Sequence, residues 1–338
     1  MRIALDATYS TGPDLSGVGV YSREILQGLA EANPDVSWEW FYRLKRFRDA
    51  RTPAGIRRRL LTEHLGSRTA DLFHGLNQRL PARRFRRQIA TFHDLFVLTG
   101  EYSTAEFRAR FAAQARHAAA AADLVIAVSR FTASHVEEHL GVPSNRIRVI
   151  HHGVLPRILP ELPREKVVLC LGAIQRRKNQ ATLVRAFRAM PPGWTLVLVG
   201  GQGFEAAATL DEINRSPARE RIILTGYLPE AEVAGWYARA SVFAFPSLDE
   251  GFGMPILEAM AAGIPVVVGN RSALPEVAGE AGVAIDPTDD DALAEALRSL
   301  AQNPELRQKL GALGRERAAR FTWTNAVAQT MAVYREIL

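Results

Sequence analysis

The sequence has little of three things that would assign a protein to a class at once: cysteine, lysine and long apolar runs. It contains one cysteine, Cys170, among 338 residues, so no disulfide can form within the chain. Asp123 and Glu258 interrupt the longest apolar stretches, and none reaches the ~18 residues of a membrane-spanning helix. Asp6 stands where a signal peptide has its apolar segment. These absences predict a cytoplasmic protein in which Cys170 is a small core residue.

Only four of the 42 basic residues are lysines, and the basic charge is unevenly distributed. Residues 1–160 contain 23 basic and 15 acidic residues, whereas residues 161–338 contain 19 and 21. The excess is concentrated in two arginine-rich stretches, one from Arg43 to Arg59 and one from Arg79 to Arg87. Such an excess predicts contact with an anionic partner, either phosphate groups or a membrane surface. Solvated arginines on helix faces would explain it equally well.

The rest of the composition is that of a globular α/β protein. Apolar residues make up 47% and charged residues 23%, and the length suggests about two domains. Short apolar runs predict six strands in each half, at 2–5, 37–42, 71–73, 88–92, 124–128 and 147–150, then at 167–171, 195–199, 221–224, 242–245, 265–268 and 283–285. Helical spacing predicts helices at 19–30, 104–121, 130–140, 179–189, 203–214, 231–240 and 255–262, with three more at 291–301, 304–320 and 324–337.

Alternating helices and fully apolar strands predict parallel sheets that are covered on both faces. A proline-rich segment at 155–163 predicts a linker near the middle of the chain. We therefore expect an α/β fold of two doubly wound domains facing a cleft. In such sheets ligands bind beyond the carboxyl ends of the strands.

The segment 245–263, FPSLDEGFGMPILEAMAAG, carries the most chemistry. Two glycines allow a tight turn after a strand, Pro255 suits the first helical position, and Gly263 suits the position past the helix end. The amides at the start of this helix predict an anion site. Glu250 and Glu258 lie eight positions apart, and two acids beside an anion site are explained if they bind the hydroxyls of a sugar and a ribose. Glu258 alone could instead be a favourable charge near a helix N-terminus.

Cations are placed to meet such an anion. Arg176, Arg177 and Lys178 follow the first strand of the second half and precede a helix, so they lie at the carboxyl edge of the sheet. Arginine and lysine there suit the neutralisation of a nucleoside diphosphate. The other interpretation is a solvated charge cluster at a helix start.

Other candidates are weaker on their own. His93 and Asp94 end an apolar strand, where the histidine is either catalytic or structural and Asp94 fixes its tautomer. Gly17 and Gly19 lack the third glycine of a dinucleotide fingerprint and equally suit a plain turn. Tyr227 follows a strand and could be a core aromatic.

Two further groups predict structure rather than chemistry. His151 and His152 are neighbours on a strand and point to opposite faces, so they predict no metal site. Three aspartates, Asp289 to Asp291, predict the cap of a helix.

Taken together, these segments resemble the retaining glycosyltransferases of family GT4, which carry two glutamates separated by seven residues. Segments at 3–7, 17–21, 91–95, 127–129, 149–154 and 171–179 also follow the family's order, so the resemblance spans nearly the whole chain. It implies the GT-B fold, with an acceptor-binding Rossmann-like domain at 1–158 and a nucleotide-sugar-binding one at 159–320. A C-terminal helix, 321–338, would return to the first domain.

The resemblance also implies a role for individual residues. Glu250 would lie under the transferred sugar and Glu258 would bind the ribose, with His93 and Asp94 beside the sugar. The pattern matches Arg177 and Lys178 as diphosphate ligands and leaves open whether Arg176 or Arg177 makes the contact. The remaining donor-binding residues would be Gly17 and Gly19 at the phosphates, Tyr227 and Leu228 at the nucleobase, and Gly251, Phe252, Gly253, Met254, Pro255 and Ile256 at the start of the helix.

The implied activity is metal-independent transfer of a hexose, without a cofactor, from a nucleotide diphosphate sugar to a glycan or lipid-linked acceptor. GDP-mannose is the first expectation, and UDP- or dTDP-sugars are the alternative. The two arginine-rich stretches would contact anionic lipid at the inner face of the cytoplasmic membrane, and no nucleic-acid partner is expected. A non-catalytic protein that binds nucleic acid or lipid would explain the charge but not the paired glutamates. A nucleotide-sugar epimerase or a phosphorylase would share the architecture.

Overall fold

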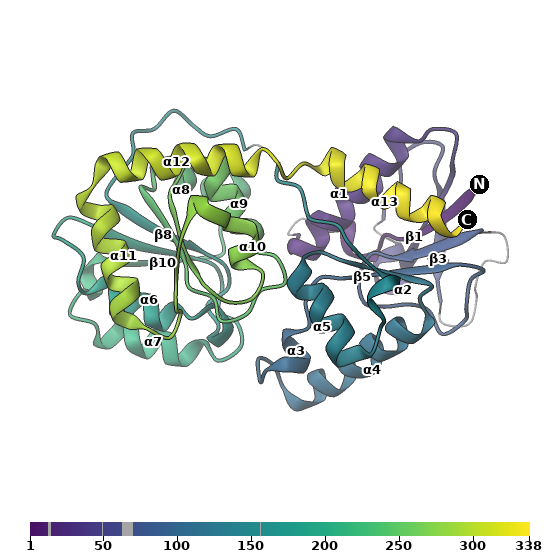
Figure 1. Cartoon of the computed structure of the whole chain (residues 1–338), viewed down its shortest axis with the longest axis horizontal. Coiled ribbons are helices and arrows are strands. Elements are labelled where there is room, and N and C mark those ends of the chain that lie inside the picture. Colours follow the sequence, from purple (N-terminus) through teal and green to yellow (C-terminus); the bar gives the residue numbers. More distant parts are fainter. Residues whose placement is uncertain (13–14, 49, 63–69, 156) are drawn as a thin grey trace. The chain divides into compact units, whose positions relative to one another are not determined.

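The computed structural model describes residues 1–12, 15–48, 50–62, 70–155 and 157–338 (Figure 1). The chain divides into two compact units, one formed by Met1–Gly153 with Thr322–Leu338 and the other by Val154–Phe321. The predicted boundary at residue 158 therefore falls inside the second unit. The last helix belongs to the first unit.

The first unit contains a seven-stranded parallel sheet with the order β3-β2-β1-β4-β5-β6-β7. Its strands are β1 (Arg2–Asp6), β2 (Ser37–Arg43), β3 (Arg57–Leu61), β4 (Leu72–Gly75), β5 (Gln88–Phe92), β6 (Leu124–Ala127) and β7 (Ile147–Val149). The strand order reverses between β1 and β4. In doubly wound folds such a switch point is where ligands bind.

Helices cover both faces of this sheet. One face packs on α1 (Gly17–Ala32) and α13 (Trp323–Ile337), which lie side by side although they come from opposite ends of the sequence (Figure 1). The two helices can approach closely because residue 28 is a glycine. A Cβ at this position would lie 2.5 Å from Val327 Cγ2. The other face packs on α3 (Phe96–Thr99), α4 (Ala105–Ala121) and α5 (Arg130–Leu140).

The second unit contains a six-stranded parallel sheet with the order β10-β9-β8-β11-β12-β13. Its strands are β8 (Val167–Leu171), β9 (Thr195–Val199), β10 (Ile222–Gly226), β11 (Val242–Phe245), β12 (Val266–Gly269) and β13 (Gly282–Ile285). Its helices are α6 (Gln180–Phe187), α7 (Ala206–Arg215), α8 (Glu230–Arg239), α9 (Met254–Ala261), α10 (Leu274–Ala278), α11 (Asp290–Gln302) and α12 (Pro304–Ala318). The apolar core beneath α6, α7 and α11 contains the buried Cys170, as expected.

The predicted α/β fold with two doubly wound parallel sheets is confirmed, with one strand missed. β3 begins with three arginines that are exposed, and only Leu61 of this strand is buried. It forms because its backbone pairs with β2 at the edge of the sheet. An apolar pattern cannot reveal a strand that is held mainly by backbone hydrogen bonds. The short helices α2 (Leu44–Phe47), α3 and α10 were also not predicted.

Candidate functional site

The predicted motifs of the second unit meet where its strand order reverses. A 3-10 turn, η3 (Arg176–Lys178), follows β8, and the segment 246–253 follows β11, the neighbouring strand. The amide of Leu248 donates to the carbonyl of Arg177 at 2.8 Å, so the two segments are directly joined. Both lie at the carboxyl edge, as predicted.

Glu250 is the centre of a buried charged group at this edge. Its Oε1 lies 2.5 Å from Lys178 Nζ and 2.9 Å from Arg177 Nη1. Arg177 also donates to the carbonyl of Asp249, and Lys178 Nζ lies 4.3 Å from the ring centre of Phe245. The three charged side chains are only 9–11% exposed. The group thus combines two cations with one anion, which leaves a positive excess for an anionic ligand.

These contacts determine how Glu250 ionises. Burial alone would raise its pKa, but the charges of Arg177 and Lys178 and their hydrogen bonds hold the pKa of Glu250 at about 2. The pKa of Lys178 is lowered, chiefly by burial and also by the charge of Arg177, although Glu250 opposes the shift. Glu250 is therefore a carboxylate at neutral pH.

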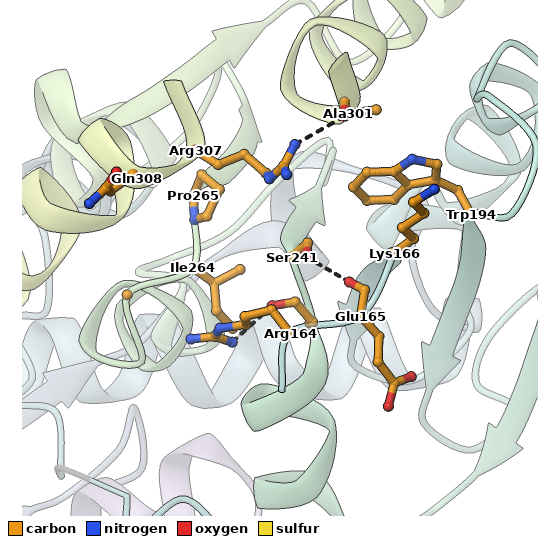
Figure 2. Close-up of a pocket in the computed structure, with 12 residues that line it drawn as sticks. Arg164, Glu165, Lys166, Trp194, Ser241, Ile264, Pro265, Ala301, Arg307 and Gln308 are labelled. Atoms are coloured by element: carbon orange, nitrogen blue, oxygen red, sulfur yellow. Dashed lines mark hydrogen bonds between the residues drawn. The ribbon is translucent and has the colours of Figure 1, made fainter. Parts of the chain in front are cut away.

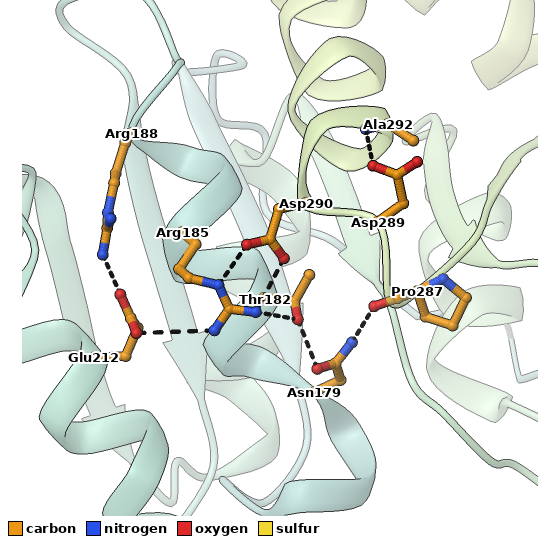
Figure 3. Close-up of polar contacts among 9 residues, drawn as sticks. All are labelled: Asn179, Thr182, Arg185, Arg188, Glu212, Pro287, Asp289, Asp290 and Ala292. Atoms are coloured by element: carbon orange, nitrogen blue, oxygen red, sulfur yellow. Dashed lines mark hydrogen bonds and ion pairs between the residues drawn. The ribbon is translucent and has the colours of Figure 1, made fainter.

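Asn179 fixes the turn that carries the two cations. Its backbone is left-handed, with φ of 57°. Its side-chain amide donates to the carbonyl of Pro246 at 3.1 Å and to that of Pro287 at 2.6 Å, the second of which is drawn in Figure 3. The turn after β8 is thereby tied to the segments that follow β11 and β13.

The acidic run in Figure 3 has a structural role. Asp289 Oδ1 accepts a hydrogen bond from the amide of Ala292 at 2.9 Å, which confirms the predicted helix cap. Asp290 pairs with Arg185, with Nε and Oδ2 2.5 Å apart.

The start of α9 has the features predicted for it. Gly253 occupies the N-cap position with φ of 101°, Pro255 lies in the first turn, and no side chain in the described part of the chain caps this end. A Cβ at Gly253 would lie 2.9 Å from Leu274 Cδ2, so this position requires glycine for both space and conformation. Gly251, Phe252 and Ile256 are buried and Met254 and Pro255 are half-buried, so a ligand here would meet mainly main chain.

Glu258 lies in the second turn of α9 and is held by two side chains that sequence reasoning missed. Its Oε2 accepts a hydrogen bond from the Tyr237 hydroxyl at 2.8 Å and lies 3.1 Å from Arg157 Nη2. Burial, reinforced by the charge of Glu258, raises the pKa of Tyr237 well above its usual range, so its hydroxyl keeps its proton. No sequence pattern connects these residues, because Tyr237 reads as a helix-face residue and Arg157 as part of a linker.

The other predicted donor-binding residues are more exposed. The Arg176 side chain is 57% exposed and pairs with Glu205 at 3.4 Å, so it does not join the group around Glu250. Tyr227 follows β10 and is 63% exposed, which excludes the core interpretation, while Leu228 is half-buried.

His93 lies at the carboxyl end of β5 in the first unit. Its Nε2 lies 2.9 Å from the carbonyl oxygen of Leu76, and burial lowers its pKa to about 4, so the imidazole is neutral with its proton on Nε2. The Leu76 carbonyl therefore sets the tautomer, a role that we expected of Asp94, which is half-buried. The rings of His93 and Tyr21 pack nearly perpendicular to each other, with ring centres 4.7 Å apart.

A buried polar chain behind His93 was not predicted. His74 Nδ1 lies 2.6 Å from the hydroxyl of Tyr334, and its Nε2 lies 2.8 Å from the hydroxyl of Thr91. Thr91 in turn lies 3.0 Å from the hydroxyl of Tyr21. The chain connects α13 with α1, and a contact across 260 residues leaves no local sequence signal.

Gly17 and Gly19 lie in the first turn of α1, which begins two residues before the predicted helix at 19–30. The N-cap Ser16 accepts a hydrogen bond from the amide of Gly19 at 3.4 Å. A Cβ at Gly19 would lie 2.9 Å from the carbonyl oxygen of Tyr9. Close packing against Tyr9 therefore explains why this position is a glycine.

A cavity of about 450 Å³ lies at the opposite, amino edge of the second sheet (Figure 2). Two of the cations that line it are already engaged with main chain. Arg164 donates to the carbonyls of Tyr237, Ala240 and Ala262, and Arg307 donates to the carbonyl of Ala301 at 3.0 Å. These carbonyls end helices α8, α9 and α11, so the arginines act as helix caps.

The described residues offer neither a membrane-spanning helix nor a cluster of metal ligands. No described helix is long and apolar enough to cross a membrane. No group of three or more histidine, cysteine or acidic side chains in the described ranges could hold a metal ion. The expected independence from metal remains a prediction.

Two sequence families match the chain in succession. Residues 15–156 match the model described as Glycosyltransferase Family 4, and residues 155–317 match Glycosyl transferases group 1. An O-antigen chain mannosyltransferase B from Escherichia coli is 32% identical over 282 residues, which cover 78% of this chain and 74% of that protein. A GDP-mannose-dependent alpha-(1-6)-phosphatidylinositol monomannoside mannosyltransferase from Mycolicibacterium smegmatis is 33% identical over 223 residues, 57% of either chain.

A solved structure has the same fold. A sucrose-phosphate synthase from Thermosynechococcus elongatus matches with a TM-score of 0.79 at 22% identity, covering 99% of this chain and 98% of that one. At this identity the match describes the fold alone.

Proposed function

The chain belongs to the group 1 glycosyltransferases of family 4, and on that premise we propose that it transfers mannose from GDP-mannose to a glycan or lipid-linked acceptor. Membership makes it a hexosyltransferase and decides against the non-catalytic protein, the epimerase and the phosphorylase. The relatives' names support mannose as the sugar. A UDP- or dTDP-sugar donor is the alternative.

The observation that carries the proposal is the buried group of Arg177, Lys178 and Glu250. Two cations held at the switch point of a doubly wound sheet suit the two phosphates of a nucleotide sugar. They would stabilise the negative charge that develops on the diphosphate as its bond to the sugar breaks. The uncapped start of α9 would add main-chain amides to the same phosphates.

The acids complete this assignment. Glu258 would bind the ribose hydroxyls, and Glu250, a carboxylate at neutral pH, would orient the sugar and favour positive charge at its anomeric carbon. The neutral imidazole of His93 suits a hydrogen bond to a sugar hydroxyl. Because charge on the diphosphate is met by side chains and amides, the reaction needs no metal in this scheme.

We infer retention of configuration from the family. The acceptor oxygen forms a bond to the anomeric carbon on the face from which the diphosphate leaves. The bond between that carbon and the phosphate oxygen breaks, and the departing diphosphate takes the acceptor's proton.

Supply of GDP-mannose, UDP-glucose, UDP-galactose and dTDP-rhamnose to the purified protein in EDTA tests the proposal. Of the four donors, we expect only GDP-mannose to be hydrolysed, with release of GDP. The rate of GDP release should rise when a mannose-containing acceptor is added. Turnover of a UDP- or dTDP-sugar instead would support the alternative donor. Turnover of none, with a folded protein, would contradict the assignment.

The acceptor would bind to the first unit, which also carries the basic residues proposed for membrane contact. Helix α2 contacts β3. These two elements and the described residues between them carry seven exposed cations, which we call the basic face. Its members are Lys45, Arg46, Arg48, Arg51, Arg57, Arg58 and Arg59, of which Arg57 and Arg59 pair with Glu39 at 4.0 and 3.4 Å. Leu44 adds an apolar side chain that is 68% exposed. This combination suits peripheral binding to anionic lipid at the inner face of the cytoplasmic membrane.

The second arginine-rich stretch is less suited to this contact. Arg84 and Arg87 pair with Asp123 at 2.8 and 3.6 Å, and Arg86 pairs with Asp71 at 3.7 Å. Among the described residues, three of the five arginines of this stretch are thus paired with carboxylates, against two of the seven cations of the basic face. Asp49 and residues 63–69 lie outside the described residues.

Sedimentation with vesicles separates the two stretches. Vesicles with phosphatidylglycerol should pellet the protein at low salt, and phosphatidylcholine vesicles should not. Reversal of charge at Lys45 and Arg46 should abolish pelleting, whereas reversal at Arg84 and Arg86 should leave most of it. Equal loss in both variants would contradict the assignment of the basic face.

A further inference from the structure

Arg157 makes three contacts around the carboxylate of Glu258. Its Nη2 lies 3.1 Å from Glu258 Oε2, its Nη1 lies 3.1 Å from Glu230 Oε1, and its guanidinium carbon lies 5.5 Å from the ring centre of Tyr237. The Arg157 side chain is 21% exposed, in contrast to most arginines of this chain that pair at the surface. The contact with Glu258 is largely shielded from solvent, because the Glu258 side chain is 16% exposed, whereas Glu230 is 82% exposed and forms a surface pair.

The two oxygens of Glu258 differ in their surroundings. Oε2 accepts from both Arg157 and Tyr237. Among the described residues none donates to Oε1. Two contacts to one oxygen restrict the rotation of the carboxylate and so narrow the directions in which Oε1 can point.

Arg157 also compensates the negative charge of Glu258. A diphosphate approaching two carboxylates would be repelled unless each acid had its own cation. Arg177 and Lys178 compensate Glu250, and Arg157 is the cation that compensates Glu258. Burial lowers the pKa of Arg157, but the charge of Glu258 and its hydrogen bond, together with Tyr237 and Glu230, outweigh burial and raise the pKa.

We propose that Arg157 is a positioning residue for donor binding: it holds Glu258 by Oε2, directs Oε1 to the ribose hydroxyls and compensates its charge when the diphosphate binds. This inference rests on the proposed function of Glu258. Arg157 itself touches neither the sugar nor the bond that breaks. Its loss therefore affects the affinity for the donor and not the chemical step.

Arg157→Gln is the direct test. Calorimetry with GDP should show a dissociation constant raised about tenfold, because a charge-assisted hydrogen bond and its orienting effect are lost. Turnover at saturating GDP-mannose should stay within twofold. Arg157→Lys, which keeps the charge but not the fork, should recover part of the affinity.

Arg307→Gln is a matched control. Arg307 also lies over an aromatic ring, with its guanidinium carbon 5.8 Å from the ring centre of Trp194, and also makes hydrogen bonds, but at the amino edge of the sheet. Its substitution should lower thermal stability and leave the dissociation constant of GDP unchanged. A thermal unfolding curve for each variant separates loss of fold from loss of affinity.

A double-mutant cycle with Glu258→Gln tests the coupling. If Arg157 acts through Glu258, adding Arg157→Gln to Glu258→Gln should raise the dissociation constant by less than twofold. If the two substitutions instead raise the dissociation constant of GDP by factors that multiply in the double variant, the inference is overturned. Unchanged or tighter binding of GDP by Arg157→Gln would overturn it too and would make Arg157 a structural residue or a competitor of the donor.

The same data separate this inference from the proposed function. Normal binding by Glu258→Gln, or no nucleotide binding by the wild type, would remove the ribose site and the inference with it. Weak binding by Glu258→Gln together with normal binding by Arg157→Gln would overturn only the role of Arg157.

Discussion

At the two edges of the second sheet, basic side chains meet different kinds of acceptor. At the amino edge, Arg164 and Arg307 donate to main-chain carbonyls at the ends of helices. At the carboxyl edge, Arg177 and Lys178 converge on the side chain of Glu250, and Arg177 adds one hydrogen bond to the main-chain carbonyl of Asp249. The residue types are alike, but the partners are not.

The difference shows how to tell structural cations from functional ones. A carbonyl at a helix end needs a donor in every state of the folded protein, so the arginines that meet it are committed to stability. A buried carboxylate with two cations is costly to assemble and adds little net stability over an apolar core. Its presence at the switch point of the sheet is better explained by chemistry, and substitutions at the two edges should affect different properties.

Glu250→Gln should have the largest effect. The amide keeps the size of the side chain but removes the charge proposed to act beneath the sugar, so turnover should fall by about 100-fold or more. The dissociation constant of GDP should change by much less. Steady-state rates at saturating GDP-mannose and calorimetry measure the two quantities, and full turnover would end the proposed role of Glu250.

The second-largest effect is expected for Arg177→Gln, and Arg176→Gln is its matched control. Loss of the buried Arg177 should lower kcat/KM by about 10- to 100-fold, since a charged contact to the diphosphate is removed. Loss of Arg176, which is exposed and paired with Glu205, should change it by less than threefold. The opposite ranking would assign the diphosphate contact to Arg176.

Arg164→Gln probes the amino edge. It removes donors from three helix-end carbonyls and should lower the free energy of unfolding by about 1–3 kcal/mol, while turnover per folded molecule stays within twofold. Urea unfolding followed by circular dichroism gives the first quantity. A loss of turnover without a loss of stability would mean that this edge has a functional role.

The smallest expected effect is on the pH dependence of stability, which Glu250 at the carboxyl edge of the second sheet should influence in a defined direction. The pKa of Glu250 is lowered to about 2, so its ionisation stabilises the fold above the pKa of the unfolded chain, near 4. That contribution is lost as the pH falls from about 4 towards 2. The Glu250→Gln variant should show a shallower fall of stability in this window than the wild type, and an equal slope would place the shifted pKa elsewhere.

The sequence predicted what is local and missed what is tertiary. The strands at 167–171, 195–199 and 242–245 were predicted with their observed bounds, because each is an apolar run between polar segments. The turn and helix around Pro255 were predicted from glycine and proline chemistry. β3 was missed because its arginines show no apolar pattern, and its partner strand decides its structure.

Within the candidate site, residue types were predicted but their pairings were not. Lys178 and Glu250 are 72 residues apart, and Arg157 and Glu258 lie on a linker and a helix. Nothing in the spacing of either motif says which cation compensates which acid. Likewise, the choice between Arg176 and Arg177 depends on burial, which single-residue patterns do not reveal.

Calorimetric titration of the wild type and Arg177→Gln with GDP, in EDTA, tests the central claim most directly. If the carboxyl edge of the second sheet holds the diphosphate, GDP binds the wild type without metal and binds the variant at least tenfold more weakly. Equal affinity in two folded proteins would contradict the account.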